Sequence, residues 1–138
     1  MNQTADQDAS RRQAPRKKIL LVDDEERLTR QTKRTLDRAG PYEVRAVNRA
    51  QLAVVAAREF KPDLILLDVM MPDGDGGQVA ADIRDDVRLR NTPIIFLTAA
   101  VRSSEIDAHT RRIGGEIFMA KPVIIETLIA CIEEYTQP

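Results

Sequence analysis

Three runs of consecutive apolar residues constrain the fold of this 138-residue chain more than any other feature of its sequence. They lie at residues 19–22, 64–67 and 94–97, and none of them alternates between apolar and polar side chains. Bare apolar strands of this kind are typical of a parallel sheet that helices cover on both faces. The three runs therefore predict the central strands of such a sheet.

Strands and helices are expected to alternate along the rest of the chain. Alternating or apolar character predicts two more strands, at residues 42–47 and 117–119. Helical spacing of apolar residues predicts five helices, at residues 26–39, 49–60, 79–87, 104–113 and 125–132. Five strand–helix units predict an α/β fold with a doubly wound five-stranded parallel sheet of order 2-1-3-4-5 and helices on both faces.

Two of the predicted helices carry specific expectations about packing. In the helix at 49–60, the residues expected to face the core are Leu52, Val55, Ala56 and Phe60. The helix at 104–113 is expected to pack through Thr110 and Ile113 and to end at Gly114-Gly115, because glycine commonly terminates helices.

Polar residues follow four of the predicted strands directly. They are Asp23 with Asp24, then Asp68, Thr98 and Lys121. In a doubly wound sheet these strand ends meet at one edge, where ligands bind. Crowded carboxylates suit Mg²⁺, a lysine can hold a phosphoryl oxygen, and an aspartate can act as a nucleophile. Each residue alone is common in turns, caps or surfaces, but together they predict a phosphoryl-transfer site.

These strand ends resemble the receiver domain of two-component response regulators, in its single-domain, chemotaxis-regulator-like form. The matching motifs are Asp23-Asp24-Glu25, residues 64–76 (LILLDVMMPDGDG), Thr98-Ala99 and Lys121-Pro122. The resemblance extends from about residue 18 to residue 135 and implies a flavodoxin-like fold. It also implies that Asp68 accepts a phosphoryl group from a histidine kinase or phosphotransfer protein.

The resemblance further implies a role for each residue around the acceptor. Mg²⁺ would be bound by Asp24, by Asp68 and by the backbone carbonyl of Met70, with Asp23 acting mainly through water. Thr98 and Lys121 would contact the phosphoryl group, and the Lys121-Pro122 peptide bond would be cis.

Phosphorylation is expected to switch the surface of the domain. By the resemblance, Thr98 moves toward the phosphoryl group and the ring of Phe118 turns inward. The fourth helix, fifth strand and fifth helix would then bind a downstream effector protein. The chain would not be a turnover enzyme, since it would catalyse only its own phosphorylation and dephosphorylation.

Several rival interpretations are weaker. Phosphatases with a nucleophilic aspartate need a second carboxylate two residues later, where this chain has Met70. A calcium loop fails at Gly77-Gln78. The strongest rival is a receiver-like scaffold that binds proteins without phosphate, and Mg²⁺-dependent binding of a phosphoryl mimic would separate the two. His109 is interpreted as a surface or packing residue and Cys131 as helix packing.

The domain organisation is expected to be simple. Residues 1–16 are interpreted as a flexible basic tail, either a solvated leader or a contact for nucleic acid or an acidic surface, and residues 17–138 as the receiver domain. A net charge of −1 argues against direct DNA binding, and no apolar run is long enough for membrane insertion. The single cysteine favours the cytoplasm. A monomer or a phosphorylation-dependent dimer is expected, either standing alone or excised from a larger regulator.

Overall fold

The computed structural model describes residues 15–99, 110–113 and 116–137. Its main sheet has the strand order β2-β1-β3-β6-β8-β7. The first five of these strands run parallel, and β7 pairs with β8 in the antiparallel direction. Their bounds are β1 Lys17–Val22, β2 Tyr42–Val47, β3 Leu64–Asp68, β6 Ile94–Thr98, β7 Thr110–Ile113 and β8 Glu116–Ala120. The parallel part confirms the predicted 2-1-3-4-5 order.

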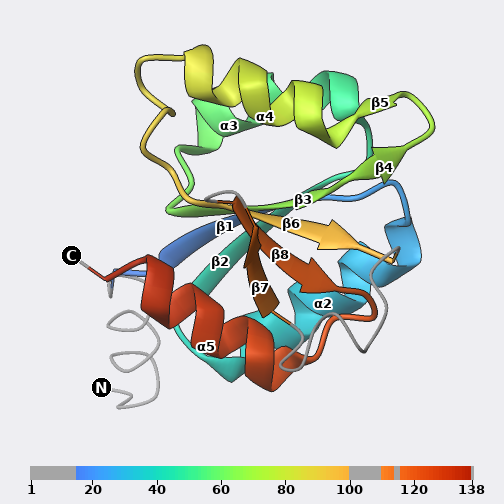
Figure 1. Cartoon of the computed structure of the whole chain (residues 1–138). Helices are drawn as coiled ribbons and strands as arrows, with labels where there is room; N and C mark the ends of the chain where they lie inside the picture. The colour runs from blue at the N-terminus through green and yellow to red at the C-terminus, as the bar shows by residue number, and fades with distance from the viewer. Residues whose placement is uncertain (1–14, 100–109, 114–115, 138) are drawn as a thin grey trace, which may run out of the picture.

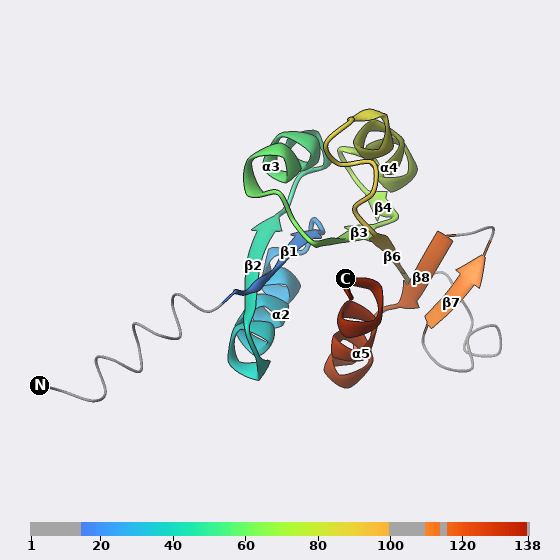
Figure 2. The same cartoon turned by 90° about the vertical axis from the view of Figure 1, so that its left-hand side faces the viewer.

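Helices cover both faces of the sheet (Figure 1). The helices α2 (Glu26–Ala39) and α5 (Ile125–Tyr135) lie on one face, and α3 (Ala53–Phe60) and α4 (Gly76–Asp85) lie on the other, as Figure 2 also shows. A short 3₁₀ turn, η1 (Ala50–Leu52), precedes α3.

The hydrophobic core is split into two clusters by the sheet. On β1, Leu20 and Val22 belong to the cluster beneath α3 and α4, whereas Ile19 and Leu21 belong to the cluster beneath α2 and α5. Successive side chains of a strand point to opposite faces, so a strand buried on both sides must be apolar at every position. This explains the bare apolar runs in the sequence.

The predicted packing of the helix at 49–60 is wrong at two positions. Leu52 and Val55 are 52% and 51% exposed, whereas Ala56 and Phe60, also predicted to face the core, are buried together with Ala53 and Ala57. Leu52 lies at the end of the 3₁₀ turn η1, which has three residues per turn, and Val55 lies on the exposed side of α3.

The helix predicted at 104–113 is also wrong at its carboxyl end. Thr110–Ile113 forms strand β7, with Thr110 opposite Met119 and Ile113 opposite Glu116. Threonine and isoleucine are β-branched and favour strands. The predicted helix stop at Gly114-Gly115 lies outside the described residues. The remainder of that predicted helix, including His109, lies outside the described residues.

A two-stranded hairpin follows β3 and was not predicted. Its strands are β4 (Met70–Met71) and β5 (Gly74–Asp75), which pair in the antiparallel direction. A Cβ atom on Gly74 would lie 2.7 Å from the Cβ of Ala50, so this close approach requires glycine. The Asp75 carboxylate accepts a 2.8 Å hydrogen bond from the amide of Gly77 and caps α4.

The ends of the chain add two findings. Of the predicted tail at residues 1–16, only residues 15 and 16 are described. Among the described residues, no helix is long and apolar enough to cross a membrane.

Candidate functional site

Four strands of the main sheet deliver polar side chains to the same edge. Asp23 follows β1, Asp68 ends β3, Thr98 ends β6 and Lys121 follows β8. The strand register keeps them level, because Asp68 pairs with Leu97 and Thr98 pairs with Ala120. Asp23, Asp68 and Thr98 are all buried, which is unusual for polar side chains outside functional or hydrogen-bonded sites.

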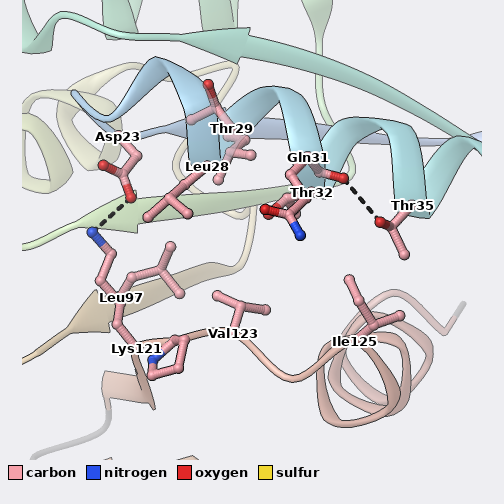
Figure 3. A pocket seen from close by; sticks show the side chains of 12 residues that line it. Asp23, Leu28, Thr29, Gln31, Thr32, Thr35, Leu97, Lys121, Val123 and Ile125 are labelled. Carbon is pink, nitrogen blue, oxygen red and sulfur yellow. Dashed lines mark hydrogen bonds and ion pairs between the residues drawn. The ribbon is translucent and has the colours of Figure 1, made fainter.

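Lys121 lies at the centre of this group. Its Nζ atom is 2.7 Å from Oδ2 of Asp23 and 3.2 Å from Oδ2 of Asp68. A longer contact of 3.4 Å reaches Oε1 of the exposed Glu25. Figure 3 shows the ammonium pointing at the Asp23 carboxylate. The backbone amide of Lys121 donates to the carbonyl of Thr98, and the Lys121-Pro122 peptide bond is cis, as the resemblance implied.

Burial and charge shift the pKa of both central groups. Burial raises the pKa of Asp68, and the negative charge of Asp23 raises it further, against the lowering effects of the Met70 amide and Lys121. Burial alone would lower the pKa of Lys121, but its hydrogen bonds and ion pairs with Asp23 and Asp68 outweigh that effect and raise it. The lysine is therefore held as a cation against two carboxylates.

The acidic residues fit a hard divalent cation. Carboxylate oxygens of Asp23, Asp24 and Asp68 all lie within 4.8 Å of one another. Mg²⁺ prefers oxygen ligands and is commonly bound through one or two carboxylates together with water and phosphate oxygens. The donor set and its spacing therefore suit Mg²⁺. Met70 contacts Asp68 through its amide, which donates to Oδ1 at 3.2 Å. The predicted role of the Met70 carbonyl as a ligand stays a prediction.

A hollow gives access to these groups. Its volume is about 620 Å³, and its lining includes Asp24, Asp68, Met70, Thr98 and Lys121. The Met70 side chain is 77% exposed at this opening. The site is therefore open to a reactant of phosphoryl size.

A second hollow lies behind the Lys121–Asp23 ion pair, between α2 and the segment that leads into α5 (Figure 3). Its volume is about 170 Å³, and its walls include Leu28, Thr32, Val123 and Ile125. The ion pair lies at one end of this hollow. Lys121 therefore lines both the acidic hollow above Asp68 and this more apolar one.

Asn48 supports the site and was missed by the sequence analysis. Its Nδ2 atom donates to the backbone carbonyl of Asp23 at 2.7 Å and to Oγ1 of Thr29 at 3.0 Å. The side chain of Asp23 in turn accepts from the amide of Glu25 at 3.0 Å. Asn48 directly follows β2, so the strand-end rule that identified the other residues could also have identified this one.

The predicted switch aromatic lies next to the core. The ring of Phe118 stacks on that of Phe96, with centroids 5.2 Å apart, and packs partly buried against the cluster beneath α3 and α4. Phe118 is on β8, and Lys121 follows the same strand. The switch role of Phe118 stays a prediction.

Comparisons with known proteins agree with this geometry. The response regulator receiver domain family matches residues 19–133. The chain is 33% identical over 119 residues to the polar-differentiation response regulator DivK of Brucella anthropi, covering 86% of this chain and 95% of that protein.

Solved structures show the same similarity. The chemotaxis protein CheY4 of Vibrio cholerae has a TM-score of 0.73 and 28% identity, covering 88% of this chain and 99% of that one. The N-terminal domain of a response regulator receiver protein from Methanoculleus marisnigri has a TM-score of 0.63 and 29% identity, covering 85% and 94%. The chain belongs to the response regulator receiver domain family of two-component signalling.

Proposed function

We propose that Asp68 accepts a phosphoryl group from a histidine kinase or phosphotransfer protein in a Mg²⁺-dependent reaction. One observation carries the proposal. The ammonium of Lys121 lies 3.2 Å from Oδ2 of Asp68, while the carboxylates of Asp23, Asp24 and Asp68 lie within 4.8 Å of one another. Lys121 can neutralise charge on one side of a transferring phosphoryl group, and a Mg²⁺ ion held by the three carboxylates could do so on the other.

The orientation of Asp68 suits nucleophilic attack. The Met70 amide holds Oδ1, and Oδ2 faces Lys121 in the open hollow. In the proposed step, a carboxylate oxygen of Asp68 forms a bond to phosphorus while the bond from phosphorus to the donor breaks. The electron pair of that bond leaves with the donor group, and the product is an acyl phosphate on Asp68.

The other residues stabilise the charge that moves in this step. Lys121 is expected to shift its ammonium from the carboxylates to a phosphoryl oxygen, and the hydroxyl of Thr98 to donate to another. Asp24 and Asp68, with the Met70 carbonyl, would bind Mg²⁺ directly, and Asp23 would do so mainly through water. Bound Mg²⁺ would supply positive charge that offsets both the carboxylates and the phosphoryl oxygens.

The product is proposed to act as a switch, not to turn over as in a hydrolase. Met70 stands where a phosphatase would need its second carboxylate, so the site lacks that proton donor. Movement of Thr98 and Phe118 would shift the population between two packings of β8 and α5. A downstream effector protein would read that surface, and the domain would act as a monomer or a phosphorylation-dependent dimer.

We further propose a cytoplasmic location and no direct contact with DNA. The described part of the chain contains a single cysteine, the buried Cys131, which fits a reducing compartment. The net charge of −1 gives no long-range attraction to nucleic acid.

The proposal is tested by treating the full chain with acetyl phosphate in Mg²⁺ or in EDTA and measuring intact mass. We expect one phosphoryl group to be added in Mg²⁺ and none in EDTA. The Asp68→Asn variant should stay unmodified. The matched control is Asp82→Asn, which removes an exposed carboxylate on α4 and should be labelled normally. Labelling of Asp68→Asn, or no labelling of the unaltered chain, would overturn the assignment and favour a scaffold role.

A further inference from the structure

A short segment after β2 contacts two of the loops that surround the candidate metal site. It comprises Val47, Asn48, Arg49 and Ala50, and it runs from the last residue of β2 to the first residue of η1. Val47 and Ala50 are buried, whereas Arg49 is exposed. These four residues are called the β2–η1 segment below.

The first half of the β2–η1 segment holds the backbone of Asp23. The amide of Asp23 donates to the carbonyl of Val47 at 3.1 Å. The carbonyl of Asp23 accepts from Nδ2 of Asn48 at 2.7 Å. Hydrogen bonds on either side of the Cα atom restrict the point from which the Asp23 carboxylate extends, as the hydrogen-bond partners of metal ligands commonly do.

The second half of the segment holds the β4–β5 hairpin. The amide of Ala50 donates to Oδ1 of Asp73 at 3.2 Å. A Cβ atom on Gly74 would lie 2.7 Å from the Cβ of Ala50, so the hairpin backbone packs directly on this residue. The same hairpin carries Met70, whose amide donates to Oδ1 of Asp68. The hairpin that contacts the acceptor is thereby attached to the β2–η1 segment.

The side chain of Asp73 makes this attachment at a cost. Its Oδ2 atom is buried and has no hydrogen-bond partner among the described residues. A carboxylate with a buried, unpaired oxygen loses hydration that the protein does not replace. Within the described part of the chain, the bond from the Ala50 amide is the single hydrogen bond that this side chain makes. Local costs of this kind are typical of residues that serve a functional site.

We infer that the β2–η1 segment sets the spacing between the Asp23–Asp24 loop and the β4–β5 hairpin, and that Asn48 and Asp73 are positioning residues for the metal site. Mg²⁺ requires nearly ideal octahedral geometry with oxygens at about 2.0–2.1 Å, so the loops that carry its ligands must keep a fixed separation. Neither residue touches the ion, because each acts through the backbone that it holds. The role in metal binding rests on the proposed function, whereas the mechanical link between the two loops does not.

The first experiment measures the Mg²⁺ affinity of the full chain by isothermal titration calorimetry. Asn48→Ala and Asp73→Ala should each weaken binding about tenfold. Asp73→Asn removes the charge but keeps an acceptor for the Ala50 amide, so it should retain most of the affinity. Asp85→Ala is the control for lost charge, since it removes an exposed carboxylate at the end of α4, and it should leave the affinity unchanged. Circular dichroism of each variant checks that the fold is intact.

The double variant distinguishes one shared support from two independent ones. If both bonds act through the same segment, breaking either one releases the loops from each other. Asn48→Ala combined with Asp73→Ala should then weaken Mg²⁺ binding about tenfold in total, whereas independent contacts would multiply to about a hundredfold. The inference is overturned by a hundredfold loss, by unchanged affinity in Asp73→Ala, or by an Asp73→Asn variant that binds as weakly as Asp73→Ala.

A second measurement, made in EDTA, does not depend on the metal. In amide NMR spectra, Asp73→Ala should shift the side-chain amide signals of Asn48. It should also shift the backbone amide signal of Glu25, which donates to Oδ1 of Asp23. Asp85→Ala should shift neither signal.

The two measurements separate the inference from the proposed function. Unchanged signals of Asn48 and Glu25 in the Asp73→Ala variant would overturn the link between the loops. If these signals shift but the unaltered chain does not bind Mg²⁺, the metal site of the proposed function is overturned. The positioning roles of Asn48 and Asp73 at that site fall with it, and the link between the loops stands.

Discussion

The ammonium of Lys121 lies 2.7 Å from Oδ2 of Asp23, although the two residues come from the first and last strands of the parallel sheet in chain order. Lys121 also contacts Asp68 at 3.2 Å, so one cation is shared by two buried carboxylates. The ion pair between Lys121 and Asp23 therefore links the last βα unit of the chain, β8 and α5, to the first, β1 and α2. The acceptor and the segment that leads into α5 therefore share a contact through Lys121.

Replacing Lys121 with methionine should destabilise the protein most when Mg²⁺ is absent. The change leaves the carboxylates of Asp23 and Asp68 buried without their cation, which we expect to lower the free energy of unfolding by about 2–3 kcal/mol. Mg²⁺ should restore part of this loss, because it can supply the missing positive charge. Urea unfolding in EDTA and in Mg²⁺ measures both. The control Lys33→Met, at an exposed pair, should cost under about 1 kcal/mol. An equal loss in both buffers would contradict the prediction.

Replacing Asn48 with alanine should loosen the loop that carries Asp23. The variant removes the donor to the Asp23 carbonyl and leaves that group unsatisfied, at an expected cost of about 1–2 kcal/mol in the free energy of unfolding. Mg²⁺ binding, measured by calorimetry, should also weaken. Asn91→Ala, at an exposed position before β6, serves as the control and should change neither quantity. Unaltered stability of the Asn48 variant would show that the hydrogen bond does not hold the loop.

Replacing Gly76 with alanine should be strongly unfavourable. Its new Cβ would overlap the backbone carbonyl oxygen of Asp68 and lie 2.9 Å from the Cα of Val69, and backbone cannot move aside as a side chain can. We expect a loss of about 2–3 kcal/mol in the free energy of unfolding, measured by thermal denaturation. The neighbour Gly77→Ala is the matched control, since its Cβ would meet only the Asp75 side chain, at 3.3 Å. Similar melting temperatures for the two variants would contradict this account.

The pair of contacts at Glu133 should make stability depend on pH in the acid range. Hydrogen bonds from Lys17 and Tyr42 lower the pKa of Glu133 below its ordinary value of 4.5. A carboxylate with a lowered pKa stabilises the fold above its unfolded pKa, and this contribution is lost as pH falls through the folded value. Glu133→Gln should therefore lose up to about 1 kcal/mol at pH 7, and this loss should shrink as pH falls below 4.5.

The measurement is urea unfolding of both proteins from pH 7 to pH 3. Glu134→Gln is the control, because Glu134 is an exposed neighbour on α5 whose charge should matter equally little at both pH values. A difference between Glu133→Gln and the unaltered chain that stays constant from pH 7 to pH 3 would refute the assignment.

Much of the candidate site could be predicted from the sequence because its residues lie at or just after the ends of strands. To predict that Asp68 and Lys121 lie close together, it was enough to locate β3 and β8 and to know that parallel strands end at the same edge of a sheet. Asn48 obeys the same rule after β2 but was missed, since an asparagine in a turn has no distinctive chemistry until its hydrogen-bond acceptors are known.

The errors of the sequence analysis arise where local preferences are balanced. Thr110 and Ile113 have the spacing of a helix and the intrinsic preference for a strand. Backbone pairing with β8 favours the strand conformation of this segment. Leu52 and Val55 were assigned to the core by helical spacing, but Leu52 belongs to the 3₁₀ turn before α3 and Val55 lies on the exposed side of α3.

The sequence by itself determined the parallel sheet and the residues at its functional edge, because double burial demands apolar strands and chemistry demands particular side chains after them. Only the tertiary structure decided which oxygen meets which nitrogen: the sharing of Lys121 between Asp23 and Asp68, and the bond from Asn48 to Asp23. Those contacts join segments far apart in the chain, so they depend on strand register and loop geometry, which no local pattern of residues encodes.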